Sequence, residues 1–190
     1  VAKNPNFSSL LLVGALIAAP FMAYLALASY IYIDGFGVSE TTFSMYFASN
    51  AATSILGPVM YMRFGAGSVK KVINVGIIVA IISAILILTV GNASPIIFLL
   101  SYVLYSVMTS YFRPLISDLL LSSTKTDVGA ASSVMNFGFT VIGSIGMVVG
   151  SLQWSSYTGG LAITMLIFIS LTTTVWFYLL KAKSIRFDWK

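Results

Sequence analysis

Six long apolar segments set the strongest constraint on the fold of this chain, because each is long enough to cross a lipid bilayer. A membrane-spanning helix needs about 20 mainly apolar residues. The segments cover residues 8–33, 39–64, 72–90, 95–123, 129–152 and 161–180. Short connections rich in turn-forming residues separate them. The sequence therefore predicts an all-α membrane protein in which residues 1–190 form a single bundle of six transmembrane helices.

The composition agrees with a lipid environment and excludes several classes of function. Charged residues make up 8% of the chain, against roughly 25% in a soluble domain. Cysteine and histidine are absent, which excludes disulfides, thiolate metal sites and catalytic pairs that use either residue. The five acidic residues are scattered. We therefore expect no enzyme activity, no metal, no cofactor and no nucleic-acid partner.

The basic residues are distributed unevenly between the two sides of the predicted membrane. The first, third and fifth connections contain no lysine or arginine, and Arg113 alone lies within a segment. The remaining basic residues share the other side: Lys3, Arg63, Lys70, Lys71, Lys125, Lys181, Lys183, Arg186 and Lys190. By the positive-inside rule, that side is cytoplasmic. Both termini, including a basic tail over residues 181–190, are expected in the cytoplasm.

The third and sixth segments are more uniformly apolar than the other four. The third, VINVGIIVAIISAILILTV, is almost entirely aliphatic, whereas the first, second, fourth and fifth segments carry most of the proline, asparagine, tyrosine and arginine. This division predicts two three-helix repeats, each ending in its most lipid-exposed helix. The alternative is ordinary variation in polarity among six helices.

Polar residues recur at three- or four-residue steps on the second, fourth and fifth segments, which places them on one face of each helix. With Tyr24 of the first segment, these faces are predicted to line a substrate cavity. The candidate residues are Tyr24, Tyr46, Asn50, Ser54, Ser106, Ser110, Arg113, Asn136 and Thr140. The alternative interpretation is helix packing, which accounts well for small residues such as the Gly146 and Gly150 pair.

The stretch TSYFRPLISD places Arg113, a permanent positive charge, inside an apolar segment. At 1.5 Å per residue it lies about 27 Å along a helix that starts at Pro95, in the cytoplasmic half of the membrane. One interpretation is a side chain that reaches the inner interface near Asp118 or Asp127. The other is a fixed charge that faces the cavity. Pro114 and Pro20 are the predicted gating or hinge positions.

Several short stretches match a pattern known from transporters. They include Tyr24 and Ser29 in the first segment, Gly37 and Ser39 in the loop after it, Phe47, Ala48, Asn50 and Ala51 in the second segment, Arg63, Phe64 and Gly65 in the connection after that, and Gly129, Ala131 and Ser132 at the start of the fifth. In these positions the chain resembles the C-terminal six helices of a major facilitator superfamily transporter, nearest to the Bcr/CflA drug:proton antiporter branch. Tyr30 stands where the branch usually has proline.

The resemblance implies one half of a twelve-helix secondary transporter in a bacterial cytoplasmic membrane. Its expected activity is proton-coupled efflux of small amphipathic molecules by alternating access. Its expected partners are a substrate, protons, the lipid bilayer, and either an N-terminal six-helix half or a second copy of this chain. No carboxylate lies in the middle of a segment, so the coupling group is expected from the other half.

Two other functions fit the same residues. Export of a metabolite or sugar is favoured if Arg113 meets an anion. The alternative from another class is a membrane scaffold that does not transport and self-associates through its fifth helix.

Overall fold

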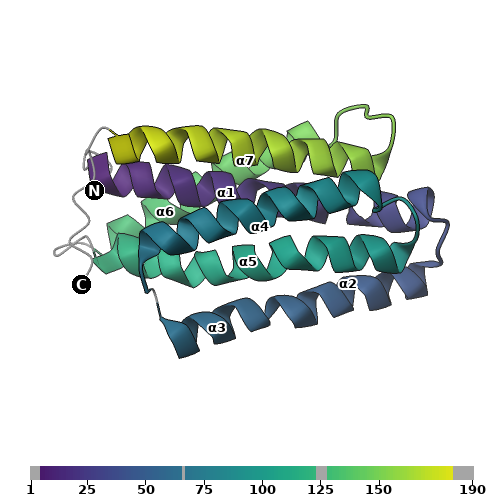
Figure 1. The fold of residues 1–190 in the computed structure, drawn as a ribbon, viewed down its shortest axis with the longest axis horizontal. Coiled ribbons are helices and arrows are strands. Elements are labelled where there is room, and N and C mark those ends of the chain that lie inside the picture. Colours follow the sequence, from purple (N-terminus) through teal and green to yellow (C-terminus); the bar gives the residue numbers. More distant parts are fainter. Residues whose placement is uncertain (1–4, 66, 123–127, 182–190) are drawn as a thin grey trace.

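The described part of the chain contains helices and no strands. The computed structural model describes residues 5–65, 67–122 and 128–181. The elements in chain order are α1 (Pro5–Ser29), the π-helical turn η1 (Tyr30–Gly35), α2 (Glu40–Ser54), α3 (Leu56–Phe64), α4 (Val69–Thr89), α5 (Pro95–Ser122), α6 (Val128–Gly150) and α7 (Tyr157–Lys181), all running lengthwise through the bundle in Figure 1. The predicted all-α class is confirmed for these residues.

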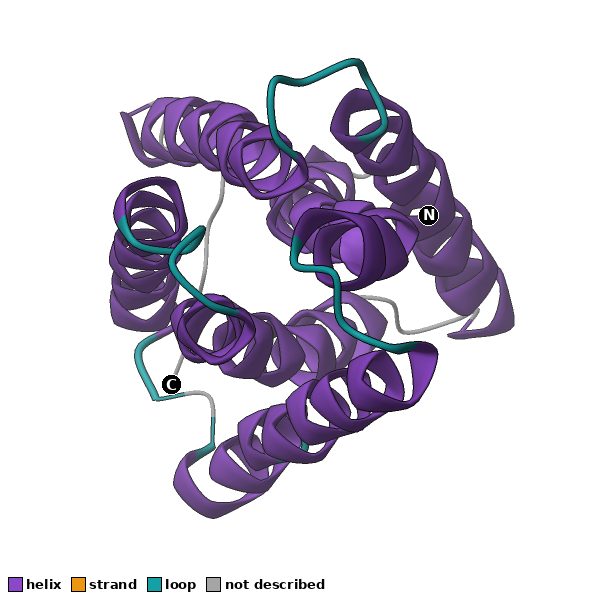
Figure 2. Ribbon diagram, turned by 90° about the vertical axis from the view of Figure 1, so that its right-hand side faces the viewer, coloured by secondary structure: helices purple, strands orange, loops and turns teal. Residues whose placement is uncertain are grey.

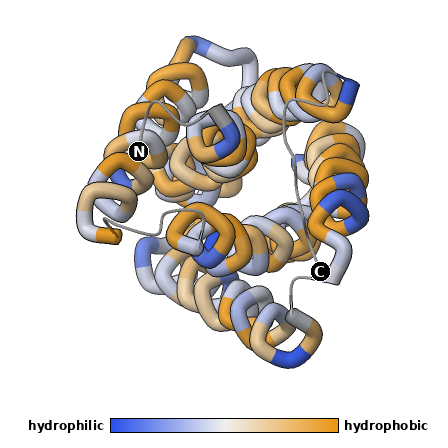
Figure 3. Tube along the Cα trace, turned by 90° about the vertical axis from the view of Figure 1, so that its left-hand side faces the viewer, coloured by the Kyte–Doolittle hydropathy of each residue, from blue (hydrophilic) through white to orange (hydrophobic). Residues whose placement is uncertain are grey.

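Five of the described helical stretches are long and apolar enough to cross a membrane. They are residues 6–35, which join α1 to η1, together with α4, α5, α6 and α7. Most positions along the helices are apolar in Figure 3, which views the bundle from one end. These lengths and compositions are those of an integral membrane protein.

The prediction of one continuous helix over residues 39–64 is wrong, because α2 ends at Ser54 and α3 begins at Leu56. Pro58 explains the break. It has no amide hydrogen to donate to the Ser54 carbonyl, and its ring crowds that carbonyl. At the break, the Ile55 amide donates to the carbonyl three residues back, that of Ala52, at 3.3 Å. In contrast, α1 and α5 continue through their internal prolines, Pro20 and Pro114.

The packing of the helices follows a repeated pattern. Helix α1 packs against α6, α7 and α5. Helix α5 packs against the α2–α3 pair, against α4 and against α1. Helix α4 also packs against α7. Exchanging α1 with α5, the α2–α3 pair with α6, and α4 with α7 leaves these main contacts unchanged. Figure 2 shows the same helices end-on.

The predicted basic side of the membrane corresponds to one end of the bundle as far as the structure describes it. Helix α3 ends there after Arg63, α4 begins there with Lys70 and Lys71, and α7 ends there at Lys181 (Figure 1). Lys3, Lys125 and the tail beyond residue 181 lie outside the described residues, so the predicted orientation in the membrane stays a prediction.

Small residues bring α6 and α1 into close contact. Gly146 faces the carbonyl of Ala19, and a Cβ atom placed on Gly150 would lie 3.0 Å from the Ala23 Cβ. Both glycines are buried. Glycine at such positions lets two helices approach until their backbones touch. The Gly146–Gly150 pair is therefore used for packing α6 against α1 of the same chain.

Gly57 brings α3 against α5 just after the Ile55 break. A Cβ atom at this position would lie 2.5 Å from the Val107 carbonyl oxygen and 2.5 Å from the Tyr111 amide nitrogen. Both atoms belong to the α5 backbone and cannot move aside without shifting the helix. The absence of a side chain at Gly57 therefore sets the distance between these helices.

We predict that Gly57→Ala lowers the free energy of unfolding by about 1–3 kcal/mol, the usual cost of overpacking. Gly138→Ala is the matched control, because its Cβ would first meet Cδ2 of Leu11, the movable end of a side chain. Denaturant titration of the protein in lipid nanodiscs measures both variants. Equal stability of the two variants would contradict the predicted backbone contact.

Candidate functional site

The predicted cavity residues divide into a buried group and an exposed group. Tyr24, Asn50 and Ser106 are buried where α1, α2 and α5 meet, with 0%, 4% and 0% of their surfaces exposed. Tyr46, Ser54 and Ser110 are half-buried, whereas Arg113, Asn136 and Thr140 are exposed on α5 and α6. The structure thus spreads the nine residues over α1, α2, α5 and α6.

Aromatic rings fill the interface between α1, α2 and α5. The Tyr24 ring stacks on Tyr102 with centroids 4.0 Å apart and on Phe47 at 6.1 Å. Near the other end of the cluster, the Tyr32 ring stacks on Tyr46 at 5.1 Å. Stacked rings at these distances contribute about 0.5–1.5 kcal/mol each beyond their burial. Tyr32 and Tyr102 were missing from the sequence-based candidates.

This interface contains polar atoms that have no hydrogen-bond partner among the described residues. All are buried, and they lie on α1, η1, α2 and α5: the hydroxyls of Tyr24, Tyr32, Tyr102, Ser106 and Thr109, and Oδ1 of Asn50. Such a group left unpaired costs roughly 1–3 kcal/mol. A cluster of this kind fits a site where the missing partner is a bound molecule.

Tyr105 shows what a satisfied hydroxyl looks like in the same helix. It is 1% exposed, one turn from Tyr102, and its hydroxyl donates to the Ile17 carbonyl at 2.5 Å. This bond joins α5 to α1. On the same helix, therefore, the Tyr105 hydroxyl makes a structural hydrogen bond, whereas the Tyr102 hydroxyl is unpaired among the described residues.

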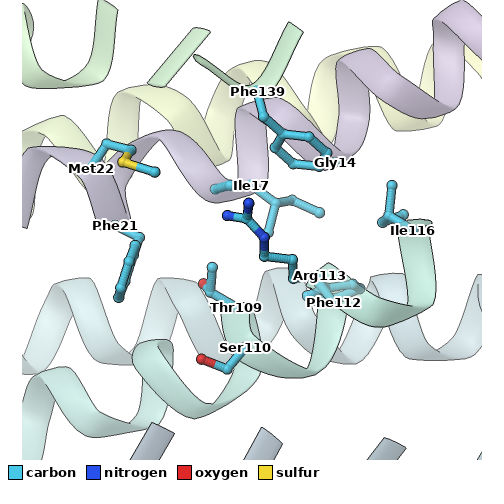
Figure 4. A pocket seen from close by; sticks show the side chains of 11 residues that line it. Gly14, Ile17, Phe21, Met22, Thr109, Ser110, Phe112, Arg113, Ile116 and Phe139 are labelled. Carbon is cyan, nitrogen blue, oxygen red and sulfur yellow. The ribbon is translucent and has the colours of Figure 1, made fainter. Parts of the chain in front are cut away.

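Arg113 lies in a pocket between α1, α5 and α6. Its side chain extends from α5 toward α1 and toward Phe139 of α6 (Figure 4). The guanidinium carbon lies 5.6 Å from the centre of the Phe139 ring, within the range of a cation–π contact. Within the ranges 5–65, 67–122 and 128–181, no carboxylate forms a salt bridge with Arg113 at the usual distances.

Asp118, one of the two carboxylates predicted as partners of Arg113, is engaged elsewhere. The Tyr61 hydroxyl donates to Oδ2 of Asp118 at 2.9 Å, which ties the C-terminal end of α3 to α5. The Tyr111 hydroxyl strengthens the same contact by donating to the Gly65 carbonyl at 2.6 Å. The second predicted partner, Asp127, lies outside the described residues.

The exposed polar residues of α6 are partly satisfied by their own helix. Thr140 Oγ1 donates to the Asn136 carbonyl at 2.9 Å, and Ser144 Oγ donates to the Thr140 carbonyl at 2.9 Å. The Ser54 hydroxyl of α2 likewise donates to the Ala51 carbonyl at 2.7 Å. Such bonds satisfy hydroxyls, but they leave the Asn136 side chain exposed at the middle of α6.

A second hollow lies at the opposite end of the bundle from Asp118. It has a volume of about 330 Å³ and lies between η1 and the connections before α5 and α7. The Thr158 hydroxyl donates to Oδ1 of Asn92 at its wall. Because Thr158 and Asn92 are paired with each other and no described charged side chain lines it, this hollow is a weaker candidate than the Arg113 pocket.

No group of three or more His, Cys, Asp and Glu side chains comes together within the described ranges. The comparisons with known proteins return nothing: no family model, curated protein or solved structure matches the chain. The functional assignment therefore depends on the residues of the site.

We predict opposite effects for two matched tyrosine variants of α5. Tyr105→Phe should lower the free energy of unfolding by about 0.5–1.5 kcal/mol, because it removes a made hydrogen bond. Tyr102→Phe should leave stability unchanged or raise it, because it removes an unpaired buried hydroxyl. Thermal unfolding in nanodiscs compares them. A loss in Tyr102→Phe as large as that in Tyr105→Phe would show that the Tyr102 hydroxyl already has a structural partner.

Proposed function

We propose that this chain forms one six-helix half of a secondary active transporter of the major facilitator type. In this proposal the half works by alternating access, and the chain exports small amphipathic molecules in exchange for protons across a bacterial cytoplasmic membrane. The other half is a separate six-helix unit or a second copy of the chain. Three features support this assignment.

The first feature is the exchange pattern of the helix contacts. Exchanging α1 with α5, the α2–α3 pair with α6, and α4 with α7 leaves the main contacts unchanged, which is the pattern expected of an inverted repeat of three helices. Transporters built from inverted repeats place their substrate site at the repeat interface. The polar residues of this chain lie on the related helices α1, α2, α5 and α6.

The second feature is the unequal polarity of the helices. Helix α4 exposes aliphatic side chains such as Val75, Ile78 and Ile82. Its polar groups are used internally: Ser83 donates to the Ser101 carbonyl at 2.7 Å, and Trp176 of α7 donates to Asn74 at 2.9 Å. Helices α4 and α7 are therefore suited to lipid, whereas α6 carries exposed polar side chains that are costly there.

The third feature, which carries the proposal, is the unpaired charge of Arg113. An arginine inside a spanning helix normally faces the protein interior or a water-filled cavity, because lipid cannot solvate it. Arg113 lies between α1, α5 and α6, with no carboxylate partner in the ranges that the structure describes. A guanidinium stays protonated throughout the physiological range, so Arg113 supplies a fixed charge and does not carry the proton.

One observation favours the second transport function, export of a metabolite or sugar, in the form of an anionic metabolite. The same fixed positive charge attracts anionic groups, and no described acidic residue lines its pocket to bind a cation. For the scaffold alternative, the Gly146 and Gly150 pair is already packed against α1. Self-association would therefore need a different face.

We predict that Arg113→Ala lowers transport at least tenfold in the intact protein, while Arg113→Lys keeps part of it because charge is retained but the planar donors are lost. The measurement is the retention of ethidium and of carboxyfluorescein, a cationic and an anionic dye, in cells without their main efflux pumps. Immunoblotting of membranes verifies equal abundance.

Ser133→Ala is the control, because Ser133 is exposed on α6 and its hydroxyl bonds only to the Gly129 carbonyl. It should export dye like the wild type. Full transport by Arg113→Ala would show that transport does not need the arginine. Unchanged retention of both dyes on expression of the wild type would speak against efflux.

A further inference from the structure

The Arg113 pocket combines a charge, a buried hydroxyl and apolar walls. Helix α5 supplies Arg113 and Thr109 to its lining, and α1 and α6 supply most of the apolar surface. The pocket has a volume of about 50 Å³. Sites that enclose a drug-sized ligand usually have roughly 300–1,000 Å³. The pocket is therefore large enough for a small functional group but too small for a whole organic molecule.

Two donors of the pocket are without a partner in the ranges 5–65, 67–122 and 128–181. The Arg113 guanidinium has no salt bridge there, and the contact that it makes is with the face of the Phe139 ring. Thr109 is 7% exposed, and its Oγ1 atom makes no hydrogen bond. The two residues are four positions apart on α5, so they lie on the same face of that helix. Both can donate a hydrogen bond to one oxyanion.

The walls around these donors are apolar and aromatic. Phe21, Met22 and Ile17 come from α1, and Phe139 comes from α6 (Figure 4). Methionine and aromatic side chains adapt to flat or irregular apolar surfaces. A ligand held at Arg113 by its charged group would extend its apolar part along this wall.

We propose that this pocket binds the anionic head group of an amphipathic organic anion, such as an aromatic carboxylate or sulfonate. The Arg113 guanidinium can donate two parallel, charge-assisted hydrogen bonds to the anionic group. The Thr109 hydroxyl donates a further hydrogen bond to the same group. The apolar body of the anion lies against Phe21 and Met22. This assignment of a substrate class depends on the proposed transport function and makes it more specific.

The binding of benzoate to the intact protein in nanodiscs tests this proposal. Benzoate should raise the unfolding temperature in a saturable manner, because a ligand of the native state stabilises it. Benzamide and benzylammonium, which keep the ring but lack the negative charge, should produce no shift. Equal stabilisation by all three compounds would overturn the proposal.

Three variants locate the binding. Arg113→Ala should weaken benzoate binding about tenfold to a hundredfold, the range for hydrogen bonds to a charged group. Thr109→Val, which keeps the shape but removes the hydroxyl, should weaken it about twofold to tenfold. Arg63→Ala removes the same charge at the exposed end of α3, and it should bind benzoate like the wild type. Equal weakening in Arg63→Ala and Arg113→Ala would show a non-specific charge effect and overturn the proposal.

A different result is expected if a carboxylate from another segment already pairs with Arg113. If such a group already fills the pocket, wild-type protein fails to bind benzoate and Arg113→Ala lowers its stability, which overturns the inference. Dye export by cells that express the same protein would then leave the transport function standing. Benzoate binding at Arg113 without export of either dye would uphold the site and contradict the proposed function.

Discussion

The cost of an unpaired polar group in a lipid environment is the constraint on which this structure depends. Backbone groups avoid this cost by forming the hydrogen bonds of helices, which is why helices are the regular elements of the described chain. Side chains avoid it by donating to a carbonyl of their own helix, as Thr140 does, or by hydrogen bonds between helices, as Tyr105 and Tyr61 do. The groups that do neither are concentrated at the junction of α1, α2 and α5, and at Arg113. That concentration distinguishes a candidate site from ordinary packing.

Close helix packing is what brings these groups together. Glycine at positions 57 and 146 lets α3 and α6 touch the backbones of α5 and α1. The break at Pro58 separates α3 from α2, so that each can follow its own contact with α5. The aromatic rings of Tyr24, Tyr32 and Tyr102 then fill the wider space between α1, α2 and α5. Close helix contacts therefore coexist with a broad aromatic layer in the same bundle.

The apolar segments could be predicted from the sequence because segment length and hydrophobicity dominate in a membrane. The α4 to α7 boundaries lie within about four residues of the prediction, the usual fraying of helix ends. The break at Ile55 was missed because Pro58 sits in an apolar run that otherwise spans a membrane. The spacing of Tyr102, Tyr105 and Thr109 on α5 placed them close to the predicted polar face. Only tertiary contacts could show that Tyr105 is paired while Tyr102 and Thr109 are not.

The most direct test of the account is a cysteine scan along α6, which is clean because the chain has no native cysteine. Cysteines replace Asn136 and Thr140 on the polar face, and Val141 and Val148 on the apolar surface, in the intact protein. A membrane-impermeant thiol reagent should modify the first pair and not the second, because only the polar face borders water. Equal protection of all four positions would contradict a water-accessible polar face and favour its burial in helix packing.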